Sequence, residues 1–183
     1  DISAYIPTNV ISITDGQIFL QQDLFNAGFR PAIDTGLSVS RVGSSAQIKA
    51  MKQVSGSLKL ELAQFAEMQA FAQFGSDLDA ATKATLDHGE KVREVLKQAQ
   101  YSPRSVEEQV ISLFALKYGF TKAIPVAKVS QFVSELYEEM KFNHADMIED
   151  IRIQKAISEE LTKQLKEVMG EFVEKFLKVN KEG

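Results

Sequence analysis

The chain has 183 residues, 44% of them hydrophobic, which is enough for one complete core or for one domain and part of another. The formal net charge is −4 with both signs interspersed, so no basic field would attract a phosphate backbone and nucleic acid is excluded as an expected partner. The absence of cysteine excludes disulfides, thiolate metal sites and a cysteine nucleophile. Neither His88 nor His144 lies in a ligand-spaced cluster, so we expect no metal site. No apolar run approaches the roughly 18 to 20 residues that span a bilayer, and we expect a soluble chain.

The first part of the chain alternates short β-prone runs with turn signals. We expect strands over three runs, at residues 9–13, 17–20 and 37–40. Residues 22–26 are predicted to form about one helical turn that Gly28 stops. These strands are too few to bury both faces of a sheet, so residues 1–47 are expected to be the end of a larger α/β domain.

The periodicity changes near Arg41 to Gln47, and the rest of the chain is helical in pattern. One broad apolar face recurs at three-to-four spacing in Leu58, Leu60, Leu62, Phe65, Met68 and Phe71. We expect this helix to be bounded by breaks at Gly56 and Gly75. A second helix is predicted over 79–98, capped by Ser76-Asp77 and interrupted near His88-Gly89.

Four further helices are expected, each starting near a residue that caps or breaks helices. Ser102 and Pro103 are predicted to begin a helix that ends at Gly119. Another helix is expected after Pro125, a shorter one from Asn143, and a last one capped by Ser158. About six amphipathic helices with short turns make a bundle. The expected fold is therefore mainly α, with a helical bundle over 48–183 preceded by the last strands of an incomplete α/β domain.

Several segments resemble a known family. They are residues 1–17, from Asp1 through Tyr5-Ile-Pro-Thr-Asn-Val10 to Gln17; Phe29-Arg-Pro-Ala-Ile33; Gly36-Leu-Ser-Val-Ser-Arg-Val-Gly43; Leu60-Glu-Leu-Ala-Gln64; residues 70–82; and Leu96-Lys-Gln-Ala-Gln-Tyr-Ser-Pro103. In this order they resemble the α subunits of F-type, proton-translocating ATP synthases. The resemblance covers the whole chain and weakens after about Gly119. One departure is Ala66, where that family commonly has an arginine.

The resemblance implies a subunit that alternates with a homologous β subunit in a ring around a rotating stalk, with a non-catalytic nucleotide site of its own. It implies that residues 1–47 end the nucleotide-binding domain and that 48–183 form the C-terminal helical domain. The Walker A pattern Gly-x-x-x-x-Gly-Lys-Ser/Thr occurs nowhere in the sequence, nor does the family's N-terminal barrel. We therefore expect this chain to contribute to an H⁺-transporting ATPase without being catalytic alone.

Arg41 and Ser12 are the residues that the resemblance places near catalysis. Arg41, in Ser38-Val-Ser-Arg-Val-Gly43, would reach the neighbouring subunit's catalytic site as an arginine finger, where phosphoryl transfer develops charge. Ser12 would lie near the same phosphate site. From the residues alone, the favoured interpretation of Arg41 is an ordinary surface arginine at a strand end, and that of Ser12 is a strand residue facing a polar side.

Four residues are implied in binding the base of the non-catalytic nucleotide: Arg30, Pro31, Gln98 and Gln100. A guanidinium plane and amide side chains suit a purine's face and edges. The alternative reading is that Arg30-Pro31 forms a turn with a pre-set φ and that the glutamines lie in a solvated loop.

The implied cofactors are ATP or ADP with Mg²⁺ in the intact subunit, and no tight binding is expected for this chain alone. The implied partners are the β subunit, the central-stalk γ subunit and the peripheral-stalk δ subunit. Membrane contact would be indirect, at the cytoplasmic face of a bacterial cell membrane or the equivalent organellar face. The alternative function is a helical protein-interaction scaffold unrelated to nucleotides, which binding to a β-like partner would refute.

Overall fold

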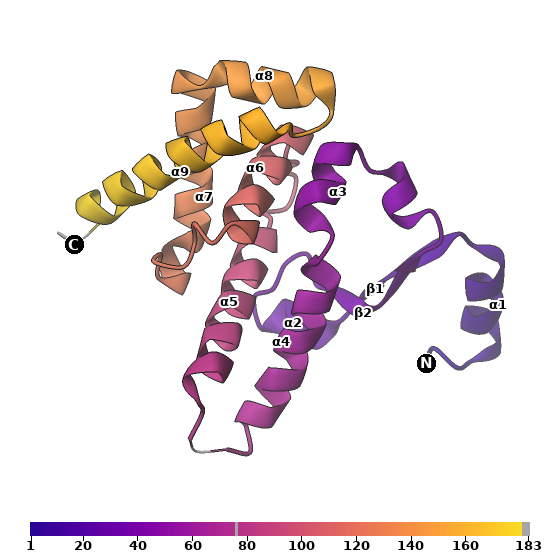
Figure 1. Ribbon diagram of the computed structural model, residues 1–183. Coiled ribbons are helices and arrows are strands. Elements are labelled where there is room, and N and C mark those ends of the chain that lie inside the picture. The colour runs from indigo at the N-terminus through magenta and orange to yellow at the C-terminus, as the bar shows by residue number, and fades with distance from the viewer. Residues whose placement is uncertain (76, 181–183) are drawn as a thin grey trace.

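The computed structural model describes residues 1–75 and 77–180 (Figure 1). The N-terminal part contains helix α1 (Tyr5–Ile13), strand β1 (Gly16–Leu20), helix α2 (Gln22–Asn26) and strand β2 (Ile33–Ser40), followed by a 3₁₀ turn at Gly43–Ala46. The helical part contains α3 (Lys49–Ser55), α4 (Leu58–Ala72), α5 (Ala80–Leu96), α6 (Val106–Lys117), α7 (Val126–Asn143), α8 (Ala145–Gln154) and α9 (Glu159–Val179). The expected mainly α fold with a short strand-bearing segment before a bundle is confirmed.

The N-terminal segment forms one antiparallel pair of strands, β1 with β2. Gly16 lies opposite Ser40, and a β-carbon at residue 16 would fall 2.4 Å from the Val39 carbonyl oxygen, so only glycine fits. The pairing is irregular between Gln17 and Phe19, where the Phe19 N–H donates to Ser38 Oγ at 3.0 Å. The predicted strand at 17–20 and the helical turn at 22–26 are confirmed, and the third strand begins earlier than expected, at Ile33.

The predicted strand at residues 9–13 is wrong, because these residues belong to α1. Within the described residues, β1 and β2 pair only with each other, so residues 9–13 have no neighbouring strand to bond with. A helix satisfies its backbone groups internally. The hydroxyl of Thr8 adds a bond to Ala4 O at 2.9 Å, and Figure 1 shows α1 at the end of the molecule away from the bundle.

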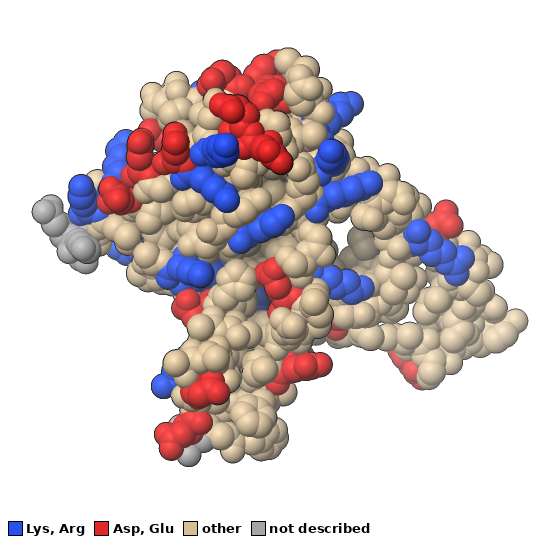
Figure 2. Space-filling view, in the orientation of Figure 1, with Lys and Arg blue, Asp and Glu red and all other residues tan. Residues whose placement is uncertain are grey.

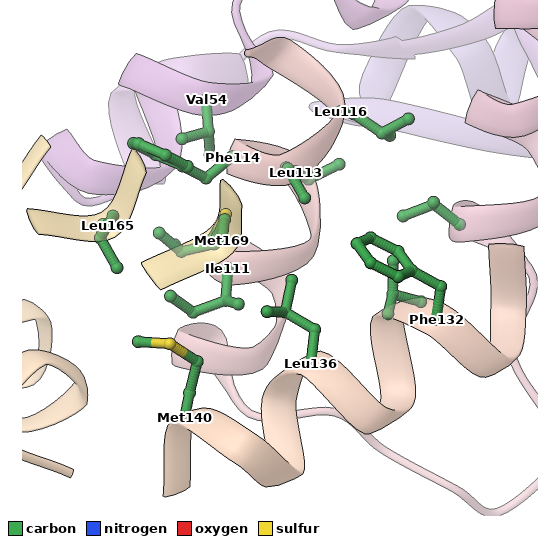
Figure 3. Packing of buried hydrophobic residues seen from close by; sticks show 14 of the residues in the cluster. Val54, Ile111, Leu113, Phe114, Leu116, Phe132, Leu136, Met140, Leu165 and Met169 are labelled. Carbon is green, nitrogen blue, oxygen red and sulfur yellow. The ribbon is translucent and has the colours of Figure 1, made fainter. Parts of the chain in front are cut away.

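Helix α6 lies at the centre of the bundle. Every residue from Val110 to Leu116 is buried, so α6 is enclosed on all sides rather than along one stripe. Figure 3 shows its side chains meeting those of α3, α7 and α9. Helix α9 contributes buried side chains at three- or four-residue spacing, namely Leu161, Leu165, Met169, Phe172 and Phe176. The rings of Phe172 and Phe176 lie 5.6 and 5.3 Å from that of Phe132, and these contacts join α9 to α7.

Helix α5 is continuous, so the interruption predicted near His88-Gly89 is wrong. Gly89 is tolerated inside the helix because it allows Phe65 of α4 to approach closely. Helix α5 is capped by Asp79, whose side chain accepts from the Thr82 N–H at 2.6 Å. Ser76, part of the predicted cap, lies outside the described residues.

Two other predicted helix starts are wrong and two are confirmed, one of them the start of α7 directly after Pro125. Helix α6 begins after Ser105 rather than Ser102, because Ser105 and Glu108 have capping-box spacing and Ser105 Oγ accepts from the Glu108 N–H at 3.1 Å. Asn143 is the last residue of α7, and α8 begins at Ala145. Ser158 caps α9 as expected, accepting from the Leu161 N–H at 3.1 Å.

Charge is unevenly distributed on the surface. Figure 2 shows acidic side chains gathered over α8 and the start of α9, with basic side chains across the middle of the same face. The lobe that carries α1 has few charges in this view and exposes large apolar side chains, among them Tyr5, Ile6 and Ile13. This lobe therefore presents an exposed apolar surface.

Candidate functional site

A cavity of about 1000 Å³ lies where the N-terminal segment meets the loop after α5. Its lining residues are Leu20, Gln21, Gln22, Phe25, Arg30, Pro31, Ala32, Gln98, Ala99 and Gln100. All four residues predicted to contact a nucleotide base are among them, although they come from two segments far apart in the sequence. The cavity is larger than a purine base needs and is formed jointly by both parts of the chain.

Arg30 holds a fixed place on one wall of this cavity. Its guanidinium carbon lies 3.9 Å from the centroid of the Phe25 ring, and its carbonyl oxygen accepts the Gln98 N–H at 2.8 Å. Arg30 precedes Pro31 through a cis peptide bond. The stacking orients the guanidinium plane. The backbone bond from Gln98 ties the loop after α5 to the N-terminal segment.

Gln98 and Gln100 form another wall, which the loop after α5 contributes. The side-chain amide nitrogen of Gln98 donates to the Ser102 carbonyl at 2.8 Å, and both glutamines are exposed. Gln100 comes directly before Tyr101, whose φ of 56° lies in the left-handed region and turns the chain back. Amide groups that both donate and accept suit the mixed pattern on a purine's edges.

The cavity can hold a flat, neutral heteroaromatic ring better than a cation. Among its described lining residues Arg30 is the one cation, and there is no carboxylate. Apolar contributions come from Leu20, Phe25 and Ala32. This mixture of apolar walls with a few convergent polar groups is typical of small-molecule sites.

Sequence reasoning missed Gln21, Gln22 and Phe25, which also line the cavity. The start of α2 turns the two glutamines toward this region, and Phe25 stacks under Arg30. The one available signal was the pair of polar residues directly after an apolar strand. Nothing in residue spacing could show that a side chain of α2 lies beneath Arg30.

Arg41 and Ser12 lie away from this cavity. Arg41 follows the end of β2, is exposed, and its N–H donates to Asp15 O at 2.7 Å. Ser12 is on α1, where its hydroxyl donates to Asn9 O at 2.7 Å. The structure does not bring these two residues into the base cavity, and their roles stay predictions.

A second hollow of about 490 Å³ lies between the N-terminal segment and α4. Ala66 lines it together with Phe29, Phe65 and Arg93. The Arg93 guanidinium carbon lies 4.8 Å from the Phe29 ring centroid and 5.8 Å from that of Phe65. Arg93 of α5 therefore supplies positive charge to the hollow that Ala66 lines.

The described residues contain neither a candidate metal site nor a candidate membrane-spanning helix. In the part of the molecule that the structure describes, no three His, Asp or Glu side chains gather in a way that could hold a metal ion. Among those same residues, no helix combines the length and the apolar character needed to cross a bilayer.

The fold is a helical bundle preceded by a segment with one two-stranded antiparallel sheet. Residues 47–172 match the C-terminal domain of the ATP synthase alpha/beta chain, and residues 1–40 match the nucleotide-binding domain of the same family. The chain belongs to the ATP synthase alpha/beta family.

Three curated relatives are named ATP synthase subunit alpha. The chain is 57% identical to the one from Rickettsia bellii and 54% identical to the one from Rickettsia canadensis, each over 98% of this chain and 35% of the relative. It is 57% identical to the one from Mycolicibacterium smegmatis over 96% of this chain and 32% of the relative. The chain thus spans about a third of the length of the curated relatives it matches.

Proposed function

We propose that this chain is part of an ATP synthase alpha subunit and supplies the base-contacting side of that subunit's non-catalytic nucleotide site. The observation that carries the proposal is the convergence of Arg30, Pro31, Gln98 and Gln100 on one cavity. The relatives named ATP synthase subunit alpha support the first part of the proposal, membership of an alpha subunit. In this function the complex is the enzyme, and the present polypeptide contributes to it without carrying out the reaction alone.

The two parts of the chain would belong to two different domains of the subunit. Residues 1–47 would complete the nucleotide-binding domain, and 48–183 would form the C-terminal helical domain. The matches to residues 1–40 and 47–172 support a division in this region. The base cavity would then lie at the seam between the two domains, a common place for ligand sites.

Arg41 would act on a neighbouring β subunit rather than on the base. It is exposed directly after the end of β2, where its backbone N–H donates to Asp15 O. A guanidinium that reaches the γ-phosphate stabilises charge developed in phosphoryl transfer. Ser12 would lie near the same phosphate, and Mg²⁺ would accompany the nucleotide.

The proposed partners are those of an alpha subunit in its complex: the β subunit, the central-stalk γ subunit and the peripheral-stalk δ subunit. The complex would be peripheral to the membrane, at the cytoplasmic face in a bacterium or the equivalent organellar face. The relatives' name supports membership of such a complex. The exposed apolar lobe around Tyr5, Ile6 and Ile13 is consistent with burial against further protein.

The test uses the full-length subunit assembled in its complex, with nucleotide affinity measured at the non-catalytic sites. Arg30→Ala and Gln100→Ala should each weaken ATP binding by about tenfold, since each removes a stacking or edge contact to the base. Gln64→Ala, an exposed glutamine of α4 that lines neither hollow, is the matched control and should leave affinity unchanged. Unchanged affinity in both cavity variants would contradict the proposal.

A further inference from the structure

The loop between α5 and α6 carries three cavity residues, Gln98, Ala99 and Gln100, but is poorly held by packing. Residues 98–103 are all exposed, and Tyr101 is 93% exposed. The base cavity lies on one side of the loop. On another side is a hollow of about 300 Å³ lined by Gly28, Arg30, Lys97, Gln98, Ala99, Ser102, Arg104 and Ser130. With space on both sides, the position of the loop depends on hydrogen bonds.

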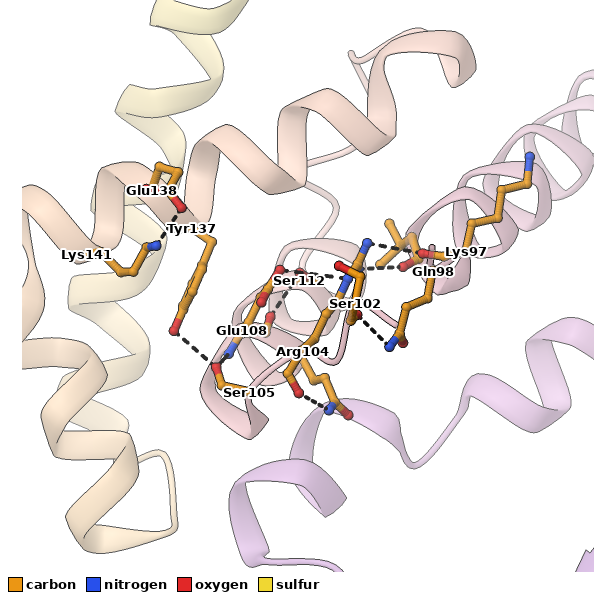
Figure 4. Close-up of polar contacts among 12 residues, drawn as sticks. Lys97, Gln98, Ser102, Arg104, Ser105, Glu108, Ser112, Tyr137, Glu138 and Lys141 are labelled. Carbon is orange, nitrogen blue, oxygen red and sulfur yellow. Dashed lines mark hydrogen bonds and ion pairs between the residues drawn. The ribbon is translucent and has the colours of Figure 1, made fainter. Parts of the chain in front are cut away.

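Arg104 makes two hydrogen bonds that reach across this loop (Figure 4). Its Nη1 donates to the Val95 carbonyl at 3.2 Å and its Nη2 to the Lys97 carbonyl at 3.1 Å. These carbonyls belong to the C-terminal end of α5, where helical carbonyls lack internal partners and carry partial negative charge. A half-buried guanidinium therefore both bonds and neutralises this end.

Arg104 is itself anchored to α6. The side chain of Gln109 donates to the Arg104 carbonyl at 3.0 Å, and Glu108 Oε1 lies 3.7 Å from Arg104 Nε. Ser105, the next residue, caps α6. The backbone of Arg104 is thus attached to α6, a rigid, buried helix, and its side chain is bonded to the end of α5.

The connection continues from Arg104 to the base cavity. Lys97, whose carbonyl Arg104 holds, directly precedes Gln98. Gln98 then bonds through its N–H to Arg30 O at 2.8 Å and through its side chain to Ser102 O at 2.8 Å. A change at Arg104 therefore reaches both walls of the cavity through one residue.

We propose that Arg104 is a positioning residue for base recognition: by holding the Val95 and Lys97 carbonyls, it sets where Gln98 and Gln100 face the cavity. The inference rests on the proposed base-binding function of that cavity. Arg104 lines the smaller hollow rather than the base cavity, so it acts through the loop and not on the ligand.

The two bonds require an arginine. A planar guanidinium can donate to two separate carbonyls at once with both nitrogens held in one plane. A lysine keeps the positive charge beside the helix end but is a single point donor on a flexible stem. Arg104→Lys should therefore retain part of the positioning, and Arg104→Met none of it.

The experiment measures ATP and GTP affinity at the non-catalytic sites of the assembled complex. Arg104→Met should weaken ATP binding by about fivefold to tenfold and shrink the ATP-to-GTP affinity ratio as Gln98→Ala does, because misplaced amides no longer read the base edge. Arg104→Lys should fall between Arg104→Met and the unsubstituted chain. Arg152→Met, which removes an exposed arginine paired with Glu149 on α8, is the control and should change neither value.

The outcomes separate the two claims. An unchanged ATP-to-GTP ratio in Arg104→Met, with Gln98→Ala still altering it, would make Arg104 a purely structural residue and overturn the inference. Unchanged affinity and ratio in both Gln98→Ala and Gln100→Ala would overturn the base-binding function itself. Amide exchange in the full-length subunit checks folding: faster exchange at Gln98 with α6 still protected is expected, whereas unchanged exchange at Gln98 would also overturn the inference.

Discussion

Gly89 lies against the side chain of Phe65 so closely that a β-carbon on residue 89 would fall 2.1 Å from Phe65 Cδ2. The same atom would lie 2.7 Å from Phe65 Cβ, which no change of rotamer can move away. Phe65 is on α4, is 3% exposed, and Gly89 is on α5. The missing side chain at residue 89 therefore determines how closely these two helices can pack.

Gly89→Ala is expected to destabilise the protein. Alanine gains about 1 kcal/mol in helix propensity over glycine, but forcing α4 and α5 apart costs about 1 to 3 kcal/mol, and contact with a fixed β-carbon places the cost at the upper end. Denaturant unfolding should show a lower midpoint. The control is Gly170→Ala in α9, where the added β-carbon meets nothing within 4 Å and should be neutral or stabilising. Equal stability of Gly89→Ala and the unsubstituted protein would contradict this packing.

Glu61 is predicted to make folding stability depend on pH in the acid range. Burial raises its pKa, but hydrogen bonds from Ser57 and His88 and the charge of His88 outweigh burial, so the pKa lies below its usual value of 4.5. The carboxylate and His88 Nε2 are 2.9 Å apart. A depressed folded-state pKa adds stability above the unfolded-state pKa, and this is lost as pH falls through the folded-state value.

Glu61→Gln should therefore lower stability at pH 7 and matter less as the pH falls below 4.5. Urea unfolding of both proteins at pH 7 and in the acid range measures the difference. Glu67→Gln, at an exposed position on the same helix, is the matched control. A stability difference that stays constant across this pH range would show that the carboxylate's charge contributes nothing.

Lys91 is buried at 3% exposure and joins α5 to the connection before α7. Its ammonium donates to Lys122 O at 2.9 Å and lies 2.6 Å from Asp87 Oδ2. Lys91→Met fills a similar volume but removes the donor, so it should cost about 1 to 3 kcal/mol. Asp87 is half exposed and can be hydrated again. Thermal unfolding measures this loss of stability, with Lys83→Met at an exposed position as the control. Equal losses in the two variants would refute the prediction.

Arg41→Lys tests the proposed finger in the assembled complex. Lysine keeps the charge but loses the fork that contacts two phosphate oxygens, so steady-state ATP hydrolysis should fall by about 10² or more. Assembly and catalytic-site nucleotide affinity should change far less, because the contact is made mainly in the transition state. Near-normal turnover in a fully assembled enzyme would rule out the finger role.

The sequence predicted helices well where each one buries its own stripe. The Ser158 cap of α9 is a local signal and matches the structure, and the buried side chains of α9 recur at three- or four-residue spacing. Residues 9–13 show the opposite case, since β-branched residues favour a strand only where a neighbouring strand can pair with them. The interruption expected at Gly89 failed because glycine there serves a contact between helices, which one sequence does not reveal.

Four residues of the candidate site were predictable, but its other lining residues and its geometry were not. The resemblance supplied Arg30, Pro31, Gln98 and Gln100, and the structure gathers them around one cavity. The resemblance gave no indication that Phe25 contacts Arg30 or that Arg104 bonds across the loop after α5. Both contacts form only on folding. Such supporting contacts depend on side-chain placement rather than on motif spacing.

The bond from Gln98 N–H to Arg30 O has a thermodynamic consequence. Both walls of the cavity exist only while the N-terminal segment is docked on the bundle, so any molecule that fills the cavity binds the docked arrangement alone. Occupancy and docking are then linked: at a ligand concentration 100 times Kd, separating the two parts would cost about 2.7 kcal/mol more than in the empty protein. A base bound at this junction would therefore hold the two parts together reversibly. The free energy needed to separate them would rise with the nucleotide concentration in the cell.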